Sequence, residues 1–324
     1  MNKLSAKPRL RMLAGLPLLL VAGLLQAQTH RLFVTNEGDN TVTVIDSRTL
    51  KVEATIAVGN RPRGIGFSPD HSKVYVALGD DDAIGVIDTQ NLTLVDTIPA
   101  GSDPEAFAVH PGGNLYLSNE DDNLASVLDP VSREILAEIP VGIEPEGVGV
   151  TPDGSKVLVT SESTNMVHVI DVSQNAVVAN ILVGARPREV TFTADSKWAF
   201  VTSEVAGEVA KLDLATNKVV QTKSLQEIDG VKPKGVLLSP DEKLLYISTG
   251  RSNSVAVLDA ETLELIDNIA VGNRVWGIAL SRDGSRLYAA NGVSNTVSVV
   301  DTATRKEIAT VDVGDMPWGV VLDD

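Results

Sequence analysis

The stretch VGIEPEGVGVTPDGSKVLVTSESTNMVHVIDV (Val141–Val172) decides the fold. It contains a loop, an apolar run, a tight turn, a second apolar run, a polar loop and a third run rich in β-branched residues, which is typical of consecutive short strands. A near-identical passage, VGNRPRGIGFSPDHSKVYVALGDDDAIGVIDT, occupies Val58–Thr89. Self-similarity at a fixed period indicates a repeat architecture.

The number of repeats follows from an aspartate that ends each third strand. This aspartate recurs about every 42 residues, at Asp46, Asp88, Asp129, Asp171, Asp213, Asp259 and Asp301. Each unit has room for four short strands and no helix, which is typical of the blade of a β-propeller. The sequence therefore predicts an all-β, seven-bladed β-propeller with four-stranded antiparallel blades.

The two ends of the repeat region predict how the ring closes. The first unit has three strands, near Leu32–Thr35, Thr41–Asp46 and Val52–Val58, and the last strand, Trp318–Leu322, stands alone. We expect this C-terminal strand to complete the N-terminal blade, because closure removes open sheet edges. Residues 28–324 are then a single propeller domain.

Residues 1–27 have the pattern of a secretory signal peptide. Four basic residues precede the apolar run Leu13–Leu25, and Leu25-Gln26-Ala27 resembles a cleavage site. An uncleaved anchor is the alternative, although the apolar run is short for a bilayer. We expect a periplasmic or secreted protein with no membrane span after cleavage.

Charge and cysteine content exclude several classes of function. Removing the peptide would move the formal charge from −16 to about −20, because the peptide carries four basic and no acidic residues. Nucleic-acid binding requires a basic face, so no nucleic-acid partner is expected. The chain has no cysteine, so it forms no disulfide, thiolate metal site or c-type haem.

Features that recur in every blade are interpreted as structural. The seven aspartates above begin the turns between third and fourth strands, where their carboxylates can accept backbone amides. Glu189 breaks the run of small residues that otherwise alternate along the innermost strands. We expect a structural ion pair between Glu189 and Arg188 or Arg186, with projection into the channel as the alternative.

The loops that lead into the innermost strands differ most between blades, and they supply the candidate ligand-binding residues. These are Arg61, Arg63, Glu105, Glu146, Arg186, Arg188, Lys232, Lys234, Arg274, Trp276 and Trp318. Arginine can hold carboxylates in bidentate fashion and indole rings can stack, so the set suits a small planar anion. The alternative is that the arginines and glutamates pair with each other and the tryptophans fill gaps between blades.

Acidic runs in two adjacent loops make Ca²⁺ a candidate ligand. Asp80–Asp82 and Glu120–Asp122 cluster carboxylates, which Ca²⁺ prefers. The runs lack the spaced, glycine-containing pattern of a calcium loop. A solvated acidic rim is the favoured interpretation, and no metal site is assigned.

The repeats resemble a known family. VYVALGDDDAIGVID and LFVTNEGDNTVTVID are similar to the YVTN-type β-propeller repeat, and the resemblance covers all seven units. GARPREVTFTADSKWAFVTSE and GNRVWGIALSRDGSRLYAANGVSNTVSVVD resemble a narrower group of exported propellers associated with catabolism that depends on pyrroloquinoline quinone (PQQ). This resemblance implies periplasmic transporter or dehydrogenase components as partners, and PQQ as a candidate ligand.

Three functions follow as hypotheses. The first is an exported, non-enzymatic binding or scaffold protein that serves a PQQ-dependent alcohol-oxidising or transport system, with a small anionic ligand or a protein at the channel mouth. The second is a propeller-type lactone hydrolase using Glu105, Glu144, Glu146 and Arg188. The third is an acidic platform for a basic protein. No catalytic residue is assigned, because no histidine joins these groups and no nucleophile motif is present.

Overall fold

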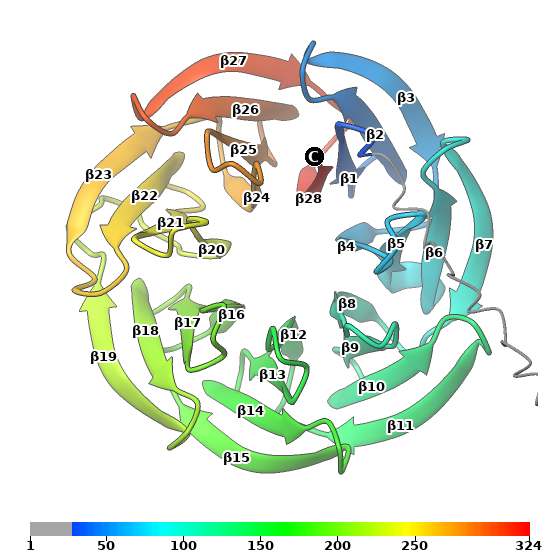
Figure 1. Cartoon of the computed structure of the whole chain (residues 1–324), viewed down its shortest axis with the longest axis vertical. Helices are drawn as coiled ribbons and strands as arrows, with labels where there is room; N and C mark the ends of the chain where they lie inside the picture. The colour runs from blue at the N-terminus through cyan, green and yellow to red at the C-terminus, as the bar shows by residue number, and fades with distance from the viewer. Residues whose placement is uncertain (1–27) are drawn as a thin grey trace, which may run out of the picture.

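The fold is a closed ring of seven β-sheets. The computed structural model describes residues 28–324, and the predicted signal peptide lies outside them. Each sheet has four antiparallel strands, and the seven innermost strands surround the axis of the ring (Figure 1). Residues of these strands line a cavity in the central channel. The predicted seven-bladed propeller is confirmed.

The blades follow the chain in order, and each runs from the innermost to the outermost strand. The first three are β28 (Pro317–Asp323), β1 (Arg31–Asn36), β2 (Thr41–Asp46) and β3 (Lys51–Ala57); β4 (Pro62–Phe67), β5 (Lys73–Leu78), β6 (Ala83–Asp88) and β7 (Thr93–Pro99); and β8 (Pro104–Val109), β9 (Leu115–Asn119), β10 (Leu124–Asp129) and β11 (Glu134–Pro140). A single 3₁₀ turn, η1 (Gly79–Asp81), joins β5 to β6.

The remaining four blades repeat this order. They are β12 (Pro145–Val150), β13 (Lys156–Ser161), β14 (Met166–Asp171) and β15 (Ala176–Leu182); β16 (Pro187–Phe192), β17 (Trp198–Ser203), β18 (Glu208–Asp213) and β19 (Lys218–Ser224); β20 (Val236–Leu238), β21 (Leu244–Ser248), β22 (Ser254–Asp259) and β23 (Leu265–Ala270); and β24 (Val275–Leu280), β25 (Arg286–Asn291), β26 (Thr296–Asp301) and β27 (Lys306–Asp312). In the described part of the chain, no helix is long and apolar enough to cross a membrane.

The first blade closes the ring with strands from both ends of the chain. β1 pairs with β2 on one side and with β28 on the other, with Leu32 opposite Leu322. The backbone N–H and hydroxyl of Thr29 donate to Asp323 at 2.8 and 2.7 Å. The predicted closure is therefore confirmed, and polar contacts reinforce the strand pairing.

Apolar residues pack between neighbouring blades and form the core. Ile84 of β6 and Leu117 of β9, for example, share one buried cluster, and seven such clusters alternate with the blades. The innermost strands approach each other closely. A Cβ on Gly277 would lie 2.6 Å from the Trp318 carbonyl oxygen, and one on Gly147 would overlap the Arg188 carbonyl. Small residues at these positions are therefore required by the ring.

The turns between third and fourth strands hold all seven repeated aspartates in one role. Each carboxylate accepts the backbone N–H two or three residues later, as when Asp46 accepts from Arg48 at 2.9 Å. These bonds lower the pKa of Asp46 to about 2, the largest cause being the amide of Thr49. The structural interpretation of these aspartates is confirmed.

The predicted partner of Glu189 is wrong. Its carboxylate pairs with the Lys234 ammonium at 2.6 Å, and not with Arg186 or Arg188. Both arginines instead face carboxylates of β12 and the loops after β13 and β17. The sequence favoured neighbours in the chain, whereas the ring brings the next blade's inner strand alongside β16.

Candidate functional site

A repeated backbone feature sets the shape of the channel mouth. The residue before each innermost strand has a left-handed conformation in six blades, as at Arg61 (φ 54°) and Arg274 (φ 56°). An Asn or Asp side chain from the preceding blade accepts its N–H, as Asn40 does for Arg61 at 3.0 Å. These bonds fix the direction in which each following side chain leaves the loop.

The loop before β20 lacks this feature. Gly207 occupies the position of the capping amide. The repeat is also four residues longer here than in most other blades, because Asp213 and Asp259 are 46 residues apart. Lys232 is not in the left-handed region. It consequently lies outside the cavity at the mouth, although the sequence placed it among the candidate ligand-binding residues.

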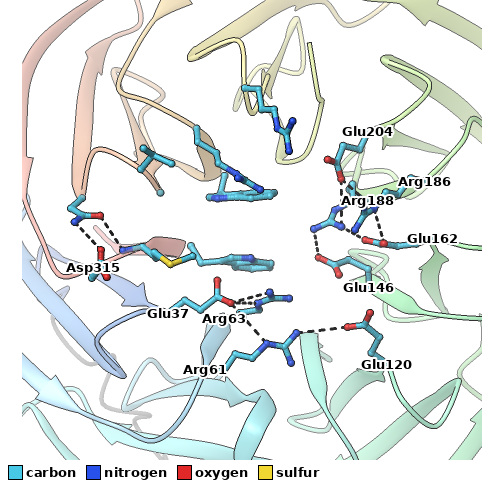
Figure 2. A pocket seen from close by; sticks show the side chains of 18 residues that line it. Glu37, Arg61, Arg63, Glu120, Glu146, Glu162, Arg186, Arg188, Glu204 and Asp315 are labelled. Atoms are coloured by element: carbon cyan, nitrogen blue, oxygen red, sulfur yellow. Dashed lines mark hydrogen bonds and ion pairs between the residues drawn. The ribbon is translucent and has the colours of Figure 1, made fainter. Parts of the chain in front are cut away.

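The mouth contains a cavity of about 590 Å³ (Figure 2). It is lined by Glu37, Arg61, Arg63, Glu120, Glu146, Glu162, Arg186, Arg188, Glu204, Arg251, Arg274, Trp276, Gly292, Val293, Asn295, Asp315, Met316 and Trp318. Eight of the eleven candidate residues are among them, namely Arg61, Arg63, Glu146, Arg186, Arg188, Arg274, Trp276 and Trp318.

Two further candidates lie below the mouth cavity. Glu105 is fully buried beneath the arginines. Lys234, also fully buried, lines a smaller cavity of about 170 Å³ in the channel, and Glu146 and Trp318 line both cavities. Glu146 and Trp318 therefore lie at the junction between the mouth cavity and the channel cavity.

The first ion-pair network of the mouth joins the first three blades. Arg61 contacts Asp103 and Glu105, and Arg63 contacts the other oxygen of Glu105. Arg63 also pairs with Glu37 at 2.9 Å. Both oxygens of the buried Glu105 are therefore engaged by guanidinium groups.

The second ion-pair network lies further along the ring. The Arg188 guanidinium is 2.7 Å from Glu146, contacts Glu162 and lies 3.6 Å from Glu204. Arg186 holds the second oxygen of Glu162 at 2.7 Å. We call the two networks together the paired side of the mouth.

The remaining arc has cations without carboxylates, and we call it the open side. It comprises Arg251, Arg274, Trp276 and Trp318. Among residues 28–324, no carboxylate comes within 4.0 Å of either guanidinium on this side. Arg274 lies 4.9 Å from the centre of the Trp276 ring, and the Lys234 ammonium lies 3.5 Å from that of Trp318. Cation–π contacts of this kind orient both rings.

Two glutamates on the paired side have opposite pKa shifts. Burial, and then the neighbouring Glu105 carboxylate, raise the pKa of Glu120 to about 8. Burial alone would also raise the pKa of Glu146, but the charges of Arg188, Lys234 and Arg63 outweigh it and lower that pKa. At neutral pH one group is a carboxylic acid and the other a carboxylate, the division of roles that acid–base catalysis uses.

One buried polar atom of the second network has no partner. It is Nε of Arg188, in a side chain that is about 95% buried. Oε1 of Glu146 makes no regular hydrogen bond but lies 2.7 Å from Nη2 of the same arginine. Buried polar atoms are normally satisfied, so a donor left without a partner at the wall of a cavity indicates a place for an oxygen atom of a ligand.

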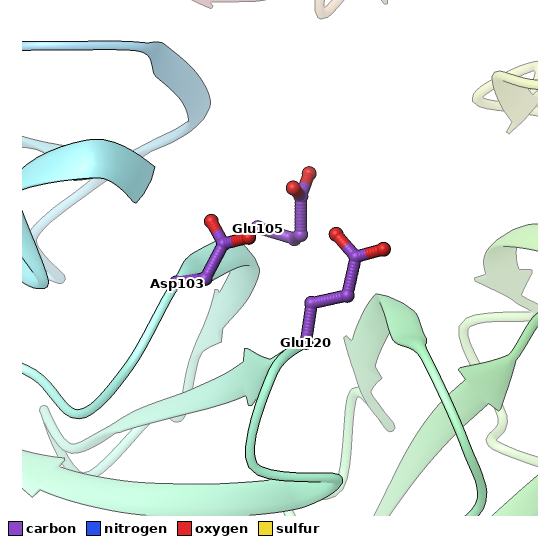
Figure 3. Close-up of side chains that lie close together, drawn as sticks. All are labelled: Asp103, Glu105 and Glu120. Atoms are coloured by element: carbon purple, nitrogen blue, oxygen red, sulfur yellow. The ribbon is translucent and has the colours of Figure 1, made fainter.

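Three carboxylates of the first network could form a cation site by distance alone. Oxygens of Asp103, Glu105 and Glu120 all lie within 4.8 Å of one another (Figure 3). Arg61 and Arg63 already supply two positive charges to this group. A divalent cation would have to displace them, so we assign no metal to it.

Several residues that line the mouth cavity were not among the candidates predicted from the sequence. Glu37, Glu162 and Glu204 each follow the last residue of a second strand directly, as Glu120 does. The signal was present, because Asn-Glu or Ser-Glu ends the second strand in four blades and not in the others. Arg251 was missed too, since its loop has no counterpart with a basic residue at that position.

Comparison with solved structures supports the fold. Hydrazine synthase from Kuenenia stuttgartiensis matches with a TM-score of 0.78 and 25% identity over 84% of this chain and 92% of that one. A protein of unknown function from Desulfotomaculum acetoxidans gives 0.78 and 16% over 90% and 98%. A candidate 6-phosphogluconolactonase from Bacteroides fragilis gives 0.77 and 20% over 91% and 98%.

Sequence comparison goes further. No curated protein shows significant similarity to the chain. The family model described as "Lactonase, 7-bladed beta-propeller" matches residues 142–310, slightly more than half of the sequence. The chain therefore belongs to the seven-bladed β-propeller lactonase family.

Proposed function

We propose that the protein is a lactone hydrolase whose reaction takes place at the paired side of the mouth. The observation that carries the proposal is the buried Glu146–Arg188 ion pair at the wall of the cavity, in which Nε of Arg188 has no hydrogen-bond partner. Family membership and a likeness to a candidate 6-phosphogluconolactonase support the same chemistry. Ring opening needs a water molecule, a base and a group that stabilises an oxyanion.

Glu146 is the proposed base. Its lowered pKa keeps it ionised at neutral pH, and its carboxylate lines the cavity, where it can accept a proton from a water molecule. The water oxygen then bonds to the carbonyl carbon of the lactone. The Arg188 guanidinium, which is fixed between Glu146 and Glu162, offers its free Nε–H to the carbonyl oxygen as negative charge develops there.

The open side suits the rest of the substrate. Arg251 and Arg274 are not neutralised by carboxylates, so they can bind an anionic group in bidentate fashion. Trp276 and Trp318 offer apolar faces to a ring beside it. We therefore infer a substrate that is a small lactone with a negatively charged substituent.

A matched pair of lactones tests the proposal. Glucarolactone carries a carboxylate where gluconolactone carries a hydroxymethyl group, and ring opening of either is followed by alkali uptake at constant pH. We expect the protein to open glucarolactone faster, and Glu146→Gln to lower kcat by about 10²–10⁴-fold. Absence of protein-dependent ring opening would refute the proposal, and so would full activity in Glu146→Gln.

A binding function linked to PQQ is the second candidate. The narrower sequence resemblance supports it, and so does the open side, because PQQ is a planar tricarboxylate that could lie on the indoles with its carboxylates on the arginines. On this proposal the exported protein serves periplasmic oxidation or transport components. Calorimetric titration with PQQ separates the candidates, since a binding protein would take up PQQ and leave lactones intact.

A further inference from the structure

Glu120 is the member of the three-carboxylate group that reaches the mouth cavity. Its side chain is 26% exposed and lines the cavity, whereas Glu105 is fully buried and Asp103 is not among the lining residues. Figure 3 shows the Glu120 carboxyl group close to that of Glu105. Glu120 emerges directly after β9, so a strand fixes its backbone.

The surroundings of Glu120 leave one place for a proton. The Glu105 oxygens are both held by Arg61 and Arg63, so Glu105 is the carboxylate of the pair. Glu120 is 3.8 Å from Arg61, beyond hydrogen-bonding distance. Oxygens of the two carboxyl groups lie within 4.8 Å of each other, and burial, followed by the hydrogen bond with Glu105, raises the pKa of Glu120. We therefore place the proton of the pair on Glu120, which donates it to Glu105.

A second observation gives this proton a use. Glu146 lines the same cavity, is buried, and is paired at 2.7 Å with Arg188, whose Nε has no hydrogen-bond partner. Figure 2 shows Glu120 and Glu146 on adjacent parts of the cavity wall. The attacking oxygen and the leaving oxygen of a lactone are bonded to the same carbon, so the base and the acid must lie side by side.

We propose that Glu120, hydrogen-bonded to the buried Glu105, is the general acid that protonates the leaving oxygen during lactone hydrolysis. The inference rests on the function proposed above and names a residue that function does not assign. Glu105 is a positioning residue, because it acts through Glu120 and does not touch the substrate.

The proton balance of the step is complete. Glu146 takes one proton from water while the water oxygen bonds to the carbonyl carbon. The bond from that carbon to the ring oxygen then breaks, and the ring oxygen takes the proton of Glu120. The product is a hydroxy acid, which loses one proton to solvent, and the proton on Glu146 restores Glu120 directly or through water.

Leaving-group dependence tests this role. Gluconolactone and glucarolactone release an alkoxide, which needs a proton, whereas dihydrocoumarin releases a phenolate, which does not. We expect Glu120→Gln to lower kcat for whichever aliphatic lactone the wild type opens by about 10²–10⁴-fold, and for dihydrocoumarin by less than about 10-fold. The wild-type rate for the aliphatic lactone should fall above about pH 8, and the variant should lack this decline.

Controls separate this proposal from a structural role and from the function itself. Glu120→Asp should recover part of the lost activity, and Asp121→Asn, in the same loop, should match the wild type. Equal losses on both kinds of lactone, or no loss on either, would overturn the role of Glu120 while leaving lactone hydrolysis in place. A wild type that opens no lactone would overturn both proposals.

Discussion

The paired and open sides of the mouth are built from the same repeat but use their charges differently. On the paired side, Arg61, Arg63, Arg186 and Arg188 are neutralised by carboxylates. On the open side, Arg274 contacts the indole ring of Trp276, and neither Arg274 nor Arg251 pairs with a carboxylate. The paired side is therefore cross-linked by its own ion pairs, whereas the guanidinium groups of the open side have no carboxylate partner and, on our proposal, bind the ligand. The predictions below test this division.

Removing an arginine from the paired side should have the largest effect. Arg188→Met leaves Glu146 buried without its cationic partner, so we expect a loss of about 3–5 kcal/mol in the free energy of unfolding. Arg274→Met on the open side removes no ion pair, and we expect a change within about 0.5 kcal/mol. Urea denaturation of both variants measures the contrast. Equal losses would show that the two sides do not differ in this way.

The same open-side substitution should affect binding instead. Arg274→Met and Arg251→Met should each raise KM for glucarolactone by about 10–100-fold, since a charged hydrogen bond contributes about 1.5–3 kcal/mol. KM for gluconolactone should stay near the wild-type value, because gluconolactone has no carboxylate that these arginines could bind. If both substrates weaken alike, the open side does not select the anion.

Stability should depend on pH through Glu120 with a defined sign. Its pKa is about 8 in the fold and near 4.5 in the unfolded chain, so the folded state retains a proton that the unfolded chain loses. Stability therefore decreases as the pH rises from about 4.5 to 8, by a modest amount because the group is partly solvated. Melting temperatures of the wild type minus those of Glu120→Gln should fall over this range, and a flat difference would contradict the shared proton.

Substitution in a repeated turn should have the smallest effect. Asp46→Ala removes two amide hydrogen bonds far from the mouth, so we expect a loss of about 1 kcal/mol or less and unchanged lactone turnover. Because the pKa of Asp46 is lowered to about 2, its contribution is present above about pH 4 and disappears as the pH falls toward 2. Thermal melts at pH 3 and pH 7 check this, and a loss of activity would show that this turn and the mouth are coupled.

The architecture of the ring could be predicted from the sequence because the pattern of one blade recurs seven times along the chain. The spacing of Asp46 and its counterparts, and the single strand left at the C-terminus, determine the blade count and the closure. The mouth residues were predicted where they follow the repeat, as Arg188 and Trp276 do. Lys232 was misplaced because extra residues and Gly207 change its loop.

The ion pairs across the mouth could not be predicted from the sequence, for a physical reason. Glu189 meets Lys234, and Arg63 meets Glu37, only because adjacent blades converge on the axis. The opposite pKa shifts of Glu120 and Glu146 depend on burial and on which arginines reach each carboxylate. Neither the burial of a carboxylate nor the arginines that reach it can be read from the pattern of residues along the chain.

A crystal structure of Glu146→Gln with glucarolactone tests the division of the mouth most directly, because the variant should bind the lactone without opening it. We predict the ligand's carboxylate within hydrogen-bonding distance of Arg251 or Arg274, its ring against Trp276 or Trp318, and its carbonyl oxygen near Arg188, with both ion-pair networks intact. A ligand whose carboxylate is bound by Arg61, Arg63 or Arg186 in place of their carboxylate partners would contradict the account.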